Sequence, residues 1–109
     1  MANEEQSAQL STDQEIDLSA LTGIRVLVAE DNEYNRIVVN DTLLNLVSDI
    51  TIDQAENGRI ALEKLRGSEY DIILMDINMP EMSGLEATRK IREEFEAPLK
   101  DIPVIALSA

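Results

Sequence analysis

The sequence predicts an α/β fold in which the strands of a parallel sheet alternate with helices. Short apolar segments recur along the chain, and segments whose apolar residues have helical spacing lie between them. Most of the short segments are apolar throughout, which is typical of strands that are buried on both faces of a parallel sheet. Strands that alternate with helices are joined by right-handed crossovers, and these crossovers place helices on both faces.

Composition narrows the possible functions. The chain has 109 residues, of which 44% are hydrophobic, so it forms at most one domain with a modest core. It has no cysteine and no histidine, which excludes disulfides, thiolate metal sites and a histidine general base. Any metal ion would be bound by oxygen ligands, and a hard ion such as Mg²⁺ prefers those ligands.

The net charge of −13 argues against binding of nucleic acid by this segment, because phosphate contacts need lysine and arginine. No apolar run approaches the roughly 20 residues of a membrane span, and the polar, acidic start does not resemble a signal peptide. We therefore expect a cytoplasmic protein that is not bound to a membrane.

Residues 1–21 differ in composition from the rest of the chain. They contain several acidic residues, no lysine or arginine, and no sustained apolar period. Such a segment cannot bury enough apolar surface to offset the entropy lost on ordering. We predict an acidic flexible tail or linker over residues 1–21 and a folded domain over residues 22–109.

The first half of this domain predicts a strand, a helix and a second strand. Residues 24–29 form an apolar segment that ends in carboxylates. A helix is expected over residues 33–47, with Asn32 as its N-cap and with apolar residues at helical spacing: Tyr34, Ile37, Val38, Leu43, Leu44, Leu46 and Val47. Residues 50–55 alternate only partly between apolar and polar, which indicates a strand with one wetter face at the edge of the sheet.

The second half predicts a helix, a strand, a helix and a strand. The Asn57-Gly58 turn precedes a short helix over residues 59–66, which Gly67 ends. Residues 71–75 form a buried strand that ends at Asp76, and Pro80 forces a turn. Ser83 caps a helix that runs to about residue 96, with Leu85, Thr88, Ile91 and Phe95 facing inward, and residues 103–107 form the fourth strand.

Polar side chains follow three of the apolar strands at the same end. Glu30 and Asp31 follow the first, Asp76 follows the third, and Ser108 follows the fourth. Bunched carboxylates destabilise one another unless a cation neutralises them, and Mg²⁺ suits a site with a few carboxylates. In open α/β sheets, ligands bind at the carboxyl ends of the strands, so this edge is the predicted functional site.

These residues resemble one family closely, the receiver domains of two-component response regulators. The resemblance covers residues 23–109, and the sequence around Asn32 and Asn35 is most similar to receivers of hybrid histidine kinases. The motifs that carry it are Val28-Ala29-Glu30-Asp31-Asn32, Asn57-Gly58, Asp76-Ile77-Asn78-Met79-Pro80, Ser83-Gly84-Leu85 and residues 103–109. The resemblance implies the flavodoxin-like fold of receivers, a doubly wound parallel sheet.

The resemblance also implies a role for each site residue. Asp76 is expected to accept a phosphoryl group from a phosphohistidine of a histidine kinase or a histidine phosphotransfer domain. Glu30, Asp31 and Asp76, with the backbone carbonyl of Asn78, are expected to bind Mg²⁺. Ser108 takes the place of the switch hydroxyl that contacts the phosphoryl group. We therefore expect a phosphoprotein that serves in signalling, and we do not expect an enzyme that turns over substrate.

The sequence departs from the family after the fourth strand. Receivers continue with a fourth helix, a fifth strand that ends in a lysine, and a last helix, so we expect 22–109 to be the N-terminal part of a receiver. None of Lys64, Lys90 and Lys100 lies at a strand end near the predicted site. The fourth strand is then an apolar edge, and such edges favour self-association.

Two other functions are open. The chain could be an interaction module that is not phosphorylated, because the family's lysine is missing. A Mg²⁺-dependent aspartyl phosphohydrolase is a more remote alternative, since Asn78 stands where those enzymes carry a second carboxylate. A nucleotide-binding domain is disfavoured, because no glycine-rich loop follows the first strand.

Overall fold

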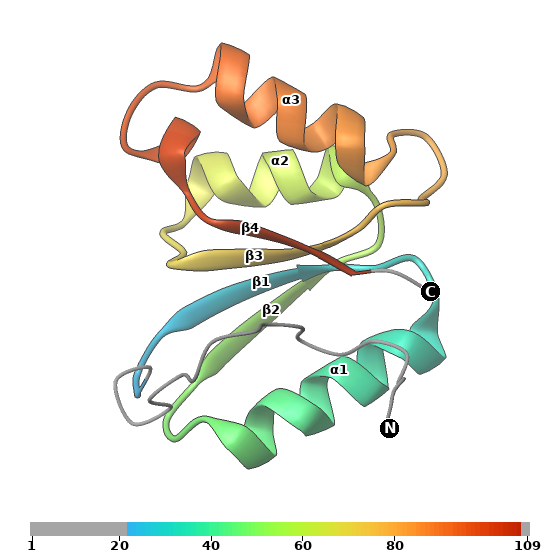
Figure 1. Ribbon diagram of the computed structural model, residues 1–109, viewed down its shortest axis with the longest axis vertical. Coiled ribbons are helices and arrows are strands. Elements are labelled where there is room, and N and C mark those ends of the chain that lie inside the picture. The colour runs from blue at the N-terminus through green and yellow to red at the C-terminus, as the bar shows by residue number, and fades with distance from the viewer. Residues whose placement is uncertain (1–21, 108–109) are drawn as a thin grey trace, which may run out of the picture.

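The structure is a computed structural model, and it describes residues 22–107. Strands and helices alternate along this part of the chain, and a short 3₁₀ helix precedes the last strand (Figure 1). The elements are β1 (Arg25–Ala29), α1 (Glu33–Leu46), β2 (Thr51–Ala55), α2 (Gly58–Gly67), β3 (Ile72–Asp76), α3 (Gly84–Glu94), the 3₁₀ helix (Leu99–Asp101) and β4 (Val104–Leu107).

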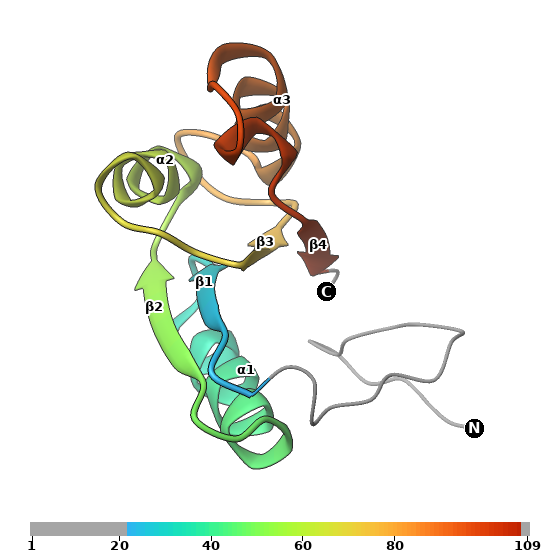
Figure 2. The ribbon, with the colours of Figure 1, turned by 90° about the vertical axis from the view of Figure 1, so that its left-hand side faces the viewer.

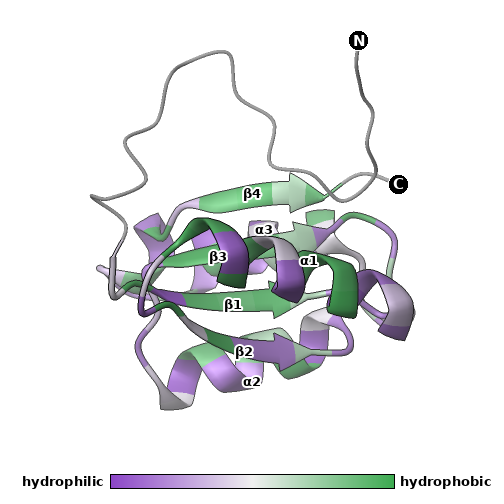
Figure 3. Cartoon of the chain, turned by 90° about the horizontal axis from the view of Figure 1, so that it is seen from below, coloured by the Kyte–Doolittle hydropathy of each residue, from purple (hydrophilic) through white to green (hydrophobic). Residues whose placement is uncertain are grey.

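The strands form one parallel sheet in the order β2-β1-β3-β4. The predicted α/β fold with a parallel sheet is confirmed, and so is the edge position of β2. Figure 3 shows β1, β3 and β4 as mostly hydrophobic, whereas β2 carries a hydrophilic stretch. Strands β1 and β3 have neighbours on both sides, whereas β2 has one neighbour and is only partly buried along most of its length.

Helices cover both faces of the sheet. Helix α1 lies on one face, and α2 and α3 lie side by side on the other (Figures 1 and 2). Alternate residues of β1 point to opposite faces, so Leu27 packs with α2 and α3, and Val28 packs with α1. Both side chains are fully buried, which places the centre of the core on the two middle strands.

Side-chain caps fix where each helix begins. The side chains of Asn32, Asn57 and Ser83 accept hydrogen bonds from backbone N–H groups three residues further on, at 3.0, 2.9 and 3.1 Å. The predicted caps Asn32 and Ser83 are confirmed. Helix α2 begins one residue earlier than predicted because Asn57 acts as its cap.

The inner face of α1 is narrower than the sequence indicates. Only Val39 and Leu43 are buried within the helix, whereas four of the predicted apolar residues are exposed, namely Tyr34, Ile37, Leu44 and Leu46. Among the described helices, α1 alone lies on this face of the sheet, so no other described helix covers the sides of α1 (Figure 2). Its outer apolar side chains therefore remain in contact with water.

The predicted inner face of α3 is also partly wrong. Ile91 and Phe95 are buried as expected, but Leu85 is 69% exposed and Ala87 takes the inward position instead. The helix begins at Gly84, so Leu85 lies in its first turn, which turns the side chain away from the sheet. Ala87 belongs to the core cluster that α2 and α3 form on this face of the sheet.

Two predicted features lie outside the described residues, namely the tail over residues 1–21 and the site residue Ser108. Within residues 22–107, no helix combines the length and the apolar character needed to cross a bilayer.

Candidate functional site

Three carboxylates meet at the carboxyl edge of the sheet. Glu30 and Asp31 directly follow β1, and Asp76 is the last residue of β3. Strands β1 and β3 are neighbours and pair in register, so their ends lie side by side. One carboxylate oxygen from each of the three residues lies within 4.8 Å of the others. The structure thus brings together the three acidic residues that the sequence predicted as ligands.

The environment of Glu30 disfavours its negative charge. Burial and, to a smaller extent, the nearby carboxylate of Asp76 raise the pKa of Glu30 from 4.5 to about 7. Hydrogen bonds from Asn32 and Asn35 act in the opposite direction; the backbone N–H of Asn32 lies 3.2 Å from Oε2 of Glu30. Without a cation, Glu30 therefore holds a proton over part of the neutral pH range.

Asp76 is buried at the end of β3, and the loop that follows β3 donates a hydrogen bond to its carboxylate. The residue is 8% exposed, and its Oδ1 accepts a hydrogen bond of 3.1 Å from the backbone N–H of Asn78. Asn78 itself is exposed in the loop after β3. The ligand role of its backbone carbonyl stays a prediction.

Gly84 allows the loop to close behind Asp76. Its backbone N–H donates to the carbonyl oxygen of Ile77 at 2.9 Å. A Cβ at this position would overlap the backbone carbonyl oxygen of Asp76 and would crowd the side chain of Met75. The start of α3 therefore fits directly against the strand end that carries Asp76 only because residue 84 has no side chain.

Arg36 is a site residue that sequence reasoning missed. Its Nη1 donates a hydrogen bond of 2.8 Å to the backbone carbonyl oxygen of Glu30. The bond ties the first turn of α1 to the strand end that carries Glu30 and Asp31. Arg36 lies one turn after the cap residue Asn32, and the first turn of α1 starts beside the acidic residues. This position is the feature of the sequence from which a contact of Arg36 with the site could have been predicted.

The lysines of the described residues lie away from the three carboxylates. Lys64 donates to the backbone carbonyl oxygen of Gln54 on β2, and Lys90 donates to Glu94 on the surface of α3. Lys100 is in the 3₁₀ helix before β4, at the opposite edge of the sheet. Among residues 22–107, no lysine thus accompanies the three carboxylates, as the sequence predicted.

The three carboxylates fit a magnesium ion. Their oxygen atoms are hard ligands that come from two adjacent strands and converge within a few ångströms. The pKa of Glu30 is raised mainly by burial and in part by the repulsion between its carboxylate and that of Asp76, so the negative charge of Glu30 is disfavoured without a cation. Binding of Mg²⁺ would offset this repulsion, and Asp31, which is exposed, leaves one side of the site open to water.

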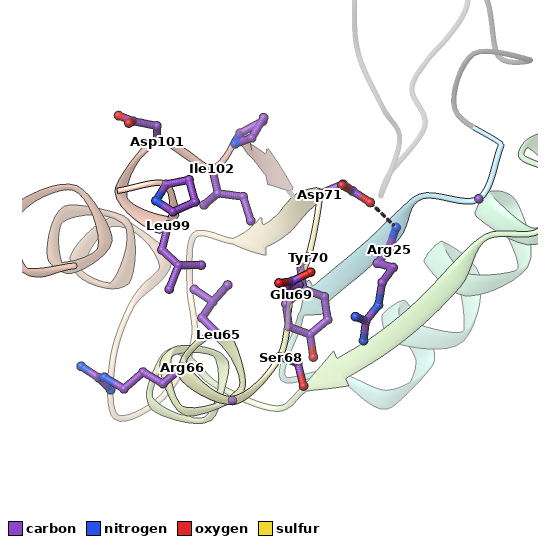
Figure 4. A pocket seen from close by; sticks show the side chains of 14 residues that line it. Arg25, Leu65, Arg66, Ser68, Glu69, Tyr70, Asp71, Leu99, Asp101 and Ile102 are labelled. Atoms are coloured by element: carbon purple, nitrogen blue, oxygen red, sulfur yellow. Dashed lines mark hydrogen bonds between the residues drawn. The ribbon is translucent and has the colours of Figure 1, made fainter. Parts of the chain in front are cut away.

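A separate hollow lies at the opposite end of the strands, where β1 and β3 begin. It has a volume of about 1020 Å³ and is open to solvent, with Leu65, Tyr70 and Leu99 in its lining (Figure 4). Two of its polar side chains are already paired within the protein: the Tyr70 hydroxyl donates to Asp53 at 2.6 Å, and Asp71 accepts a hydrogen bond from the Arg25 backbone N–H at 2.8 Å. The three converging carboxylates lie away from this hollow and remain the candidate site.

Comparison with known proteins agrees with this geometry. The sequence profile of the response regulator receiver domain matches residues 26–109. A hybrid signal transduction histidine kinase of Dictyostelium discoideum is 44% identical over 100 residues, which are 87% of this chain and 6% of the kinase. A two-component response regulator of Oryza sativa subsp. japonica is 46% identical over 71 residues, which are 63% of this chain and 56% of that protein.

Solved structures of receiver domains have the same fold. The response regulator TrrA of Thermotoga maritima, in complex with Mg²⁺-BeF, has a TM-score of 0.69 and 37% identity, over 79% of this chain and 70% of that one. The receiver domain of a sensor histidine kinase of Pseudomonas aeruginosa, with a magnesium ion coordinated in its active site cleft, has a TM-score of 0.69 and 32% identity, over 77% of this chain and 66% of that one. The chain belongs to the response regulator receiver domain family, the phosphoacceptor modules of two-component systems.

Proposed function

We propose that Asp76 accepts the phosphoryl group in this receiver. The proposal rests on the position of Asp76, which is the last residue of a central strand and is 8% exposed. One of its carboxylate oxygens lies within 4.8 Å of a carboxylate oxygen of Glu30 and of Asp31. Its Oδ1 is held by the N–H of Asn78, which leaves Oδ2 as the oxygen with no bond from the loop.

In the proposed reaction, a carboxylate oxygen of Asp76 attacks the phosphorus of a phosphohistidine. An O–P bond forms as the N–P bond breaks, and the electron pair of that bond stays on the imidazole nitrogen. Asp76 becomes an aspartyl phosphate, and the histidine is regenerated. The β3 strand and the loop behind Gly84 keep the attacking carboxylate in place, so little reorganisation is needed.

Glu30, Asp31 and Asp76 would hold the magnesium ion, together with the backbone carbonyl of Asn78. When bound, Mg²⁺ would compensate the negative charges of the carboxylates and of the phosphoryl oxygens. Ser108 is the proposed switch hydroxyl; Leu107, the residue before it, pairs with Asp76 in the sheet register. Two-component relays place this chemistry in the cytoplasm, where we also place this chain.

The proposed donor is a histidine kinase or a histidine phosphotransfer domain. Helices α1 and α3 both begin at the acidic edge, and each presents one large exposed apolar residue in its first turn, Tyr34 at 72% and Leu85 at 69% exposure. Exposed apolar groups that flank a reactive centre favour docking of a protein donor. In this proposal the domain accepts a phosphoryl group and does not itself catalyse the turnover of a substrate.

Intact-mass measurement after incubation with acetyl phosphate and Mg²⁺ tests this proposal. We expect a gain of one phosphoryl group, which is lost in Asp76→Asn and retained in the control Asp101→Asn, an exposed aspartate of the 3₁₀ helix. A folded chain that binds Mg²⁺ but gains no mass would instead favour the unphosphorylated interaction module, an alternative supported by the lack of a lysine near the described carboxylates.

A further inference from the structure

We propose that the hollow at the start of β1 and β3 binds a segment of a partner protein that combines lysine or arginine with apolar side chains. This surface lies at the opposite end of the strands from the three carboxylates of the acidic edge. The proposal does not depend on the phosphoacceptor role. It rests on the apolar floor of the hollow, on the carboxylates at its rim, and on a charge distribution that disfavours other occupants.

The floor of the hollow is apolar. Leu65 and Ile102 are buried in the core cluster of this sheet face, and Leu99 packs partly buried against the same cluster. Figure 4 shows the three side chains grouped together in the hollow. The hollow has a volume of about 1020 Å³ and opens to solvent. Small-molecule pockets enclose most of their ligand, so this open shape favours a segment of chain that lies across it.

Two carboxylates stand at the rim of the hollow on different walls. Glu69 lies in the loop between α2 and β3, Asp101 is the last residue of the 3₁₀ helix, and both are exposed. In the described part of the chain neither takes part in an ion pair. The guanidinium groups of Arg25 and Arg66 each lie over an aromatic ring, 5.5 and 4.6 Å from its centroid. The rim therefore presents two carboxylates to a cation of the ligand.

Hydrogen bonds fix both walls of the hollow in the absence of a ligand. Nη1 of Arg92 donates to the backbone carbonyl oxygens of Lys100 and Ile102, both at 2.7 Å, which holds the wall formed by the 3₁₀ helix. On the other wall, the Tyr70 hydroxyl donates to Asp53 at 2.6 Å. A surface that is already held in one shape loses little conformational entropy when it binds a partner.

Charge selects a basic occupant. A second copy of the chain has a net charge of −13, and residues 1–21 contain no lysine or arginine, so both would bring mainly negative charge to Glu69 and Asp101. Nucleic acids and anionic lipids are repelled for the same reason. A lysine or arginine of a partner can instead pack its apolar stem on Leu65 and Leu99 while its charged end reaches the rim.

The hollow and the acidic edge can be occupied at the same time. Strand β1 begins at Arg25, in the lining of the hollow, and ends next to Glu30; its five residues span about 16 Å. A partner in the hollow thus leaves the three carboxylates accessible. Because the contact is small and exposed ion pairs add little, we expect a dissociation constant on the order of 100 μM.

An NMR titration of the isotopically labelled full chain tests the proposal. Mg²⁺ is present to compete for the other carboxylates, and salt at about 0.15 M screens long-range attraction. The probe is a short peptide of alternating leucine and lysine pairs, and we expect the amide signals of Leu99 and Ile102 to shift. A serine–lysine peptide lacks the apolar groups and a leucine–glutamate peptide lacks the cations, so we expect each to bind roughly tenfold more weakly or less.

Charge reversal at the rim shows where the peptide binds. The double variant Glu69→Lys with Asp101→Lys is expected to weaken the leucine–lysine peptide by roughly tenfold and to strengthen the leucine–glutamate peptide. The matched control, Asp41→Lys with Glu93→Lys, reverses two exposed carboxylates outside the hollow and changes the net charge equally. We expect it to keep the affinity of the wild type. Circular dichroism spectra check that both variants are folded.

The proposal would be overturned if both double variants lost affinity alike, if the three peptides bound equally, or if no signal shifted at about ten times the expected dissociation constant. Shifts of the Leu99 and Ile102 signals with protein concentration alone would show that a second copy fills the hollow instead. Broadening of these signals by a nitroxide on Ser11→Cys of the same chain would show that residues 1–21 fill it.

Discussion

Replacing Glu30 with glutamine is expected to stabilise the protein when Mg²⁺ is absent. The carboxyl of Glu30 is buried beside Asp76, and its pKa is raised from 4.5 to about 7. A group with a raised pKa in the folded state prefers its protonated form there. Glu30 thus costs no stability below about pH 4.5, and its cost grows as the pH rises and is complete above about pH 7. Glutamine keeps the shape of the side chain and carries no charge at any pH.

The magnitude follows from the same pKa difference. At pH 8 the whole pKa difference would lower the free energy of unfolding of the wild type by roughly 3 kcal/mol at most. The carboxyl lies at the rim of the sheet, where water screens part of the repulsion, so we expect about 1–2 kcal/mol. With Mg²⁺ we expect the sign to reverse, because Glu30 is a proposed ligand and the variant would lack the binding free energy that the wild type gains.

Urea unfolding of the wild type and Glu30→Gln at pH 8 and pH 4.5, with a chelator present, measures this difference. We expect the variant to be more stable at pH 8 and the two proteins to be equally stable at pH 4.5. A matched control is Glu93→Gln on the exposed side of α3, which is expected to change the unfolding free energy by less than about 0.5 kcal/mol at either pH. A variant that is less stable than the wild type at pH 8 without Mg²⁺ would refute the reasoning.

Three further predictions follow from the described contacts. Gly84→Ala is expected to lower the unfolding free energy by about 1–3 kcal/mol in urea titrations, because its Cβ would overlap the strand end behind it; unchanged stability would contradict this. Tyr70→Phe loses the hydrogen bond to Asp53 and is expected to cost about 1 kcal/mol near pH 7. That gap should narrow from pH 10 to 12, because burial raises the pKa of Tyr70 to about 12 and the neutral phenol is favoured in the folded state. Arg36→Met is expected to weaken Mg²⁺ binding roughly tenfold in calorimetric titrations, whereas Arg89→Met, an exposed control with the same charge change, leaves it unaltered.

The convergence of Glu30, Asp31 and Asp76 was predictable from the sequence. Each residue follows an apolar strand, and the ends of parallel strands meet at one edge, so chain order alone specified which acidic residues would be close. Helix starts were predictable for a similar local reason. Asn32 and Ser83 have side chains that bond to N–H groups within their own turn, which is independent of the rest of the fold.

The contacts of Arg36 and Gly84 were not predictable from local pattern. Arg36 reaches back to the carbonyl of Glu30, and Gly84 lies against the carbonyl of Asp76, so both contacts depend on the path of a loop. The prediction that Leu85 faces inward was wrong for a related reason. Helical spacing defines which residues share a face, but the packing of the first turn of α3 against β3 decides that Ala87 faces inward instead.

Reduction of the phosphorylated protein tests the central claim most directly. Borohydride converts an aspartyl phosphate to homoserine, which marks the acceptor permanently for peptide mass spectrometry. After incubation with acetyl phosphate and Mg²⁺, we expect homoserine at position 76 and at no other aspartate, and none when a chelator replaces Mg²⁺. Homoserine at Asp31 or at another aspartate, or equal labelling with and without Mg²⁺, would contradict the assignment of Asp76 as the magnesium-dependent phosphoacceptor.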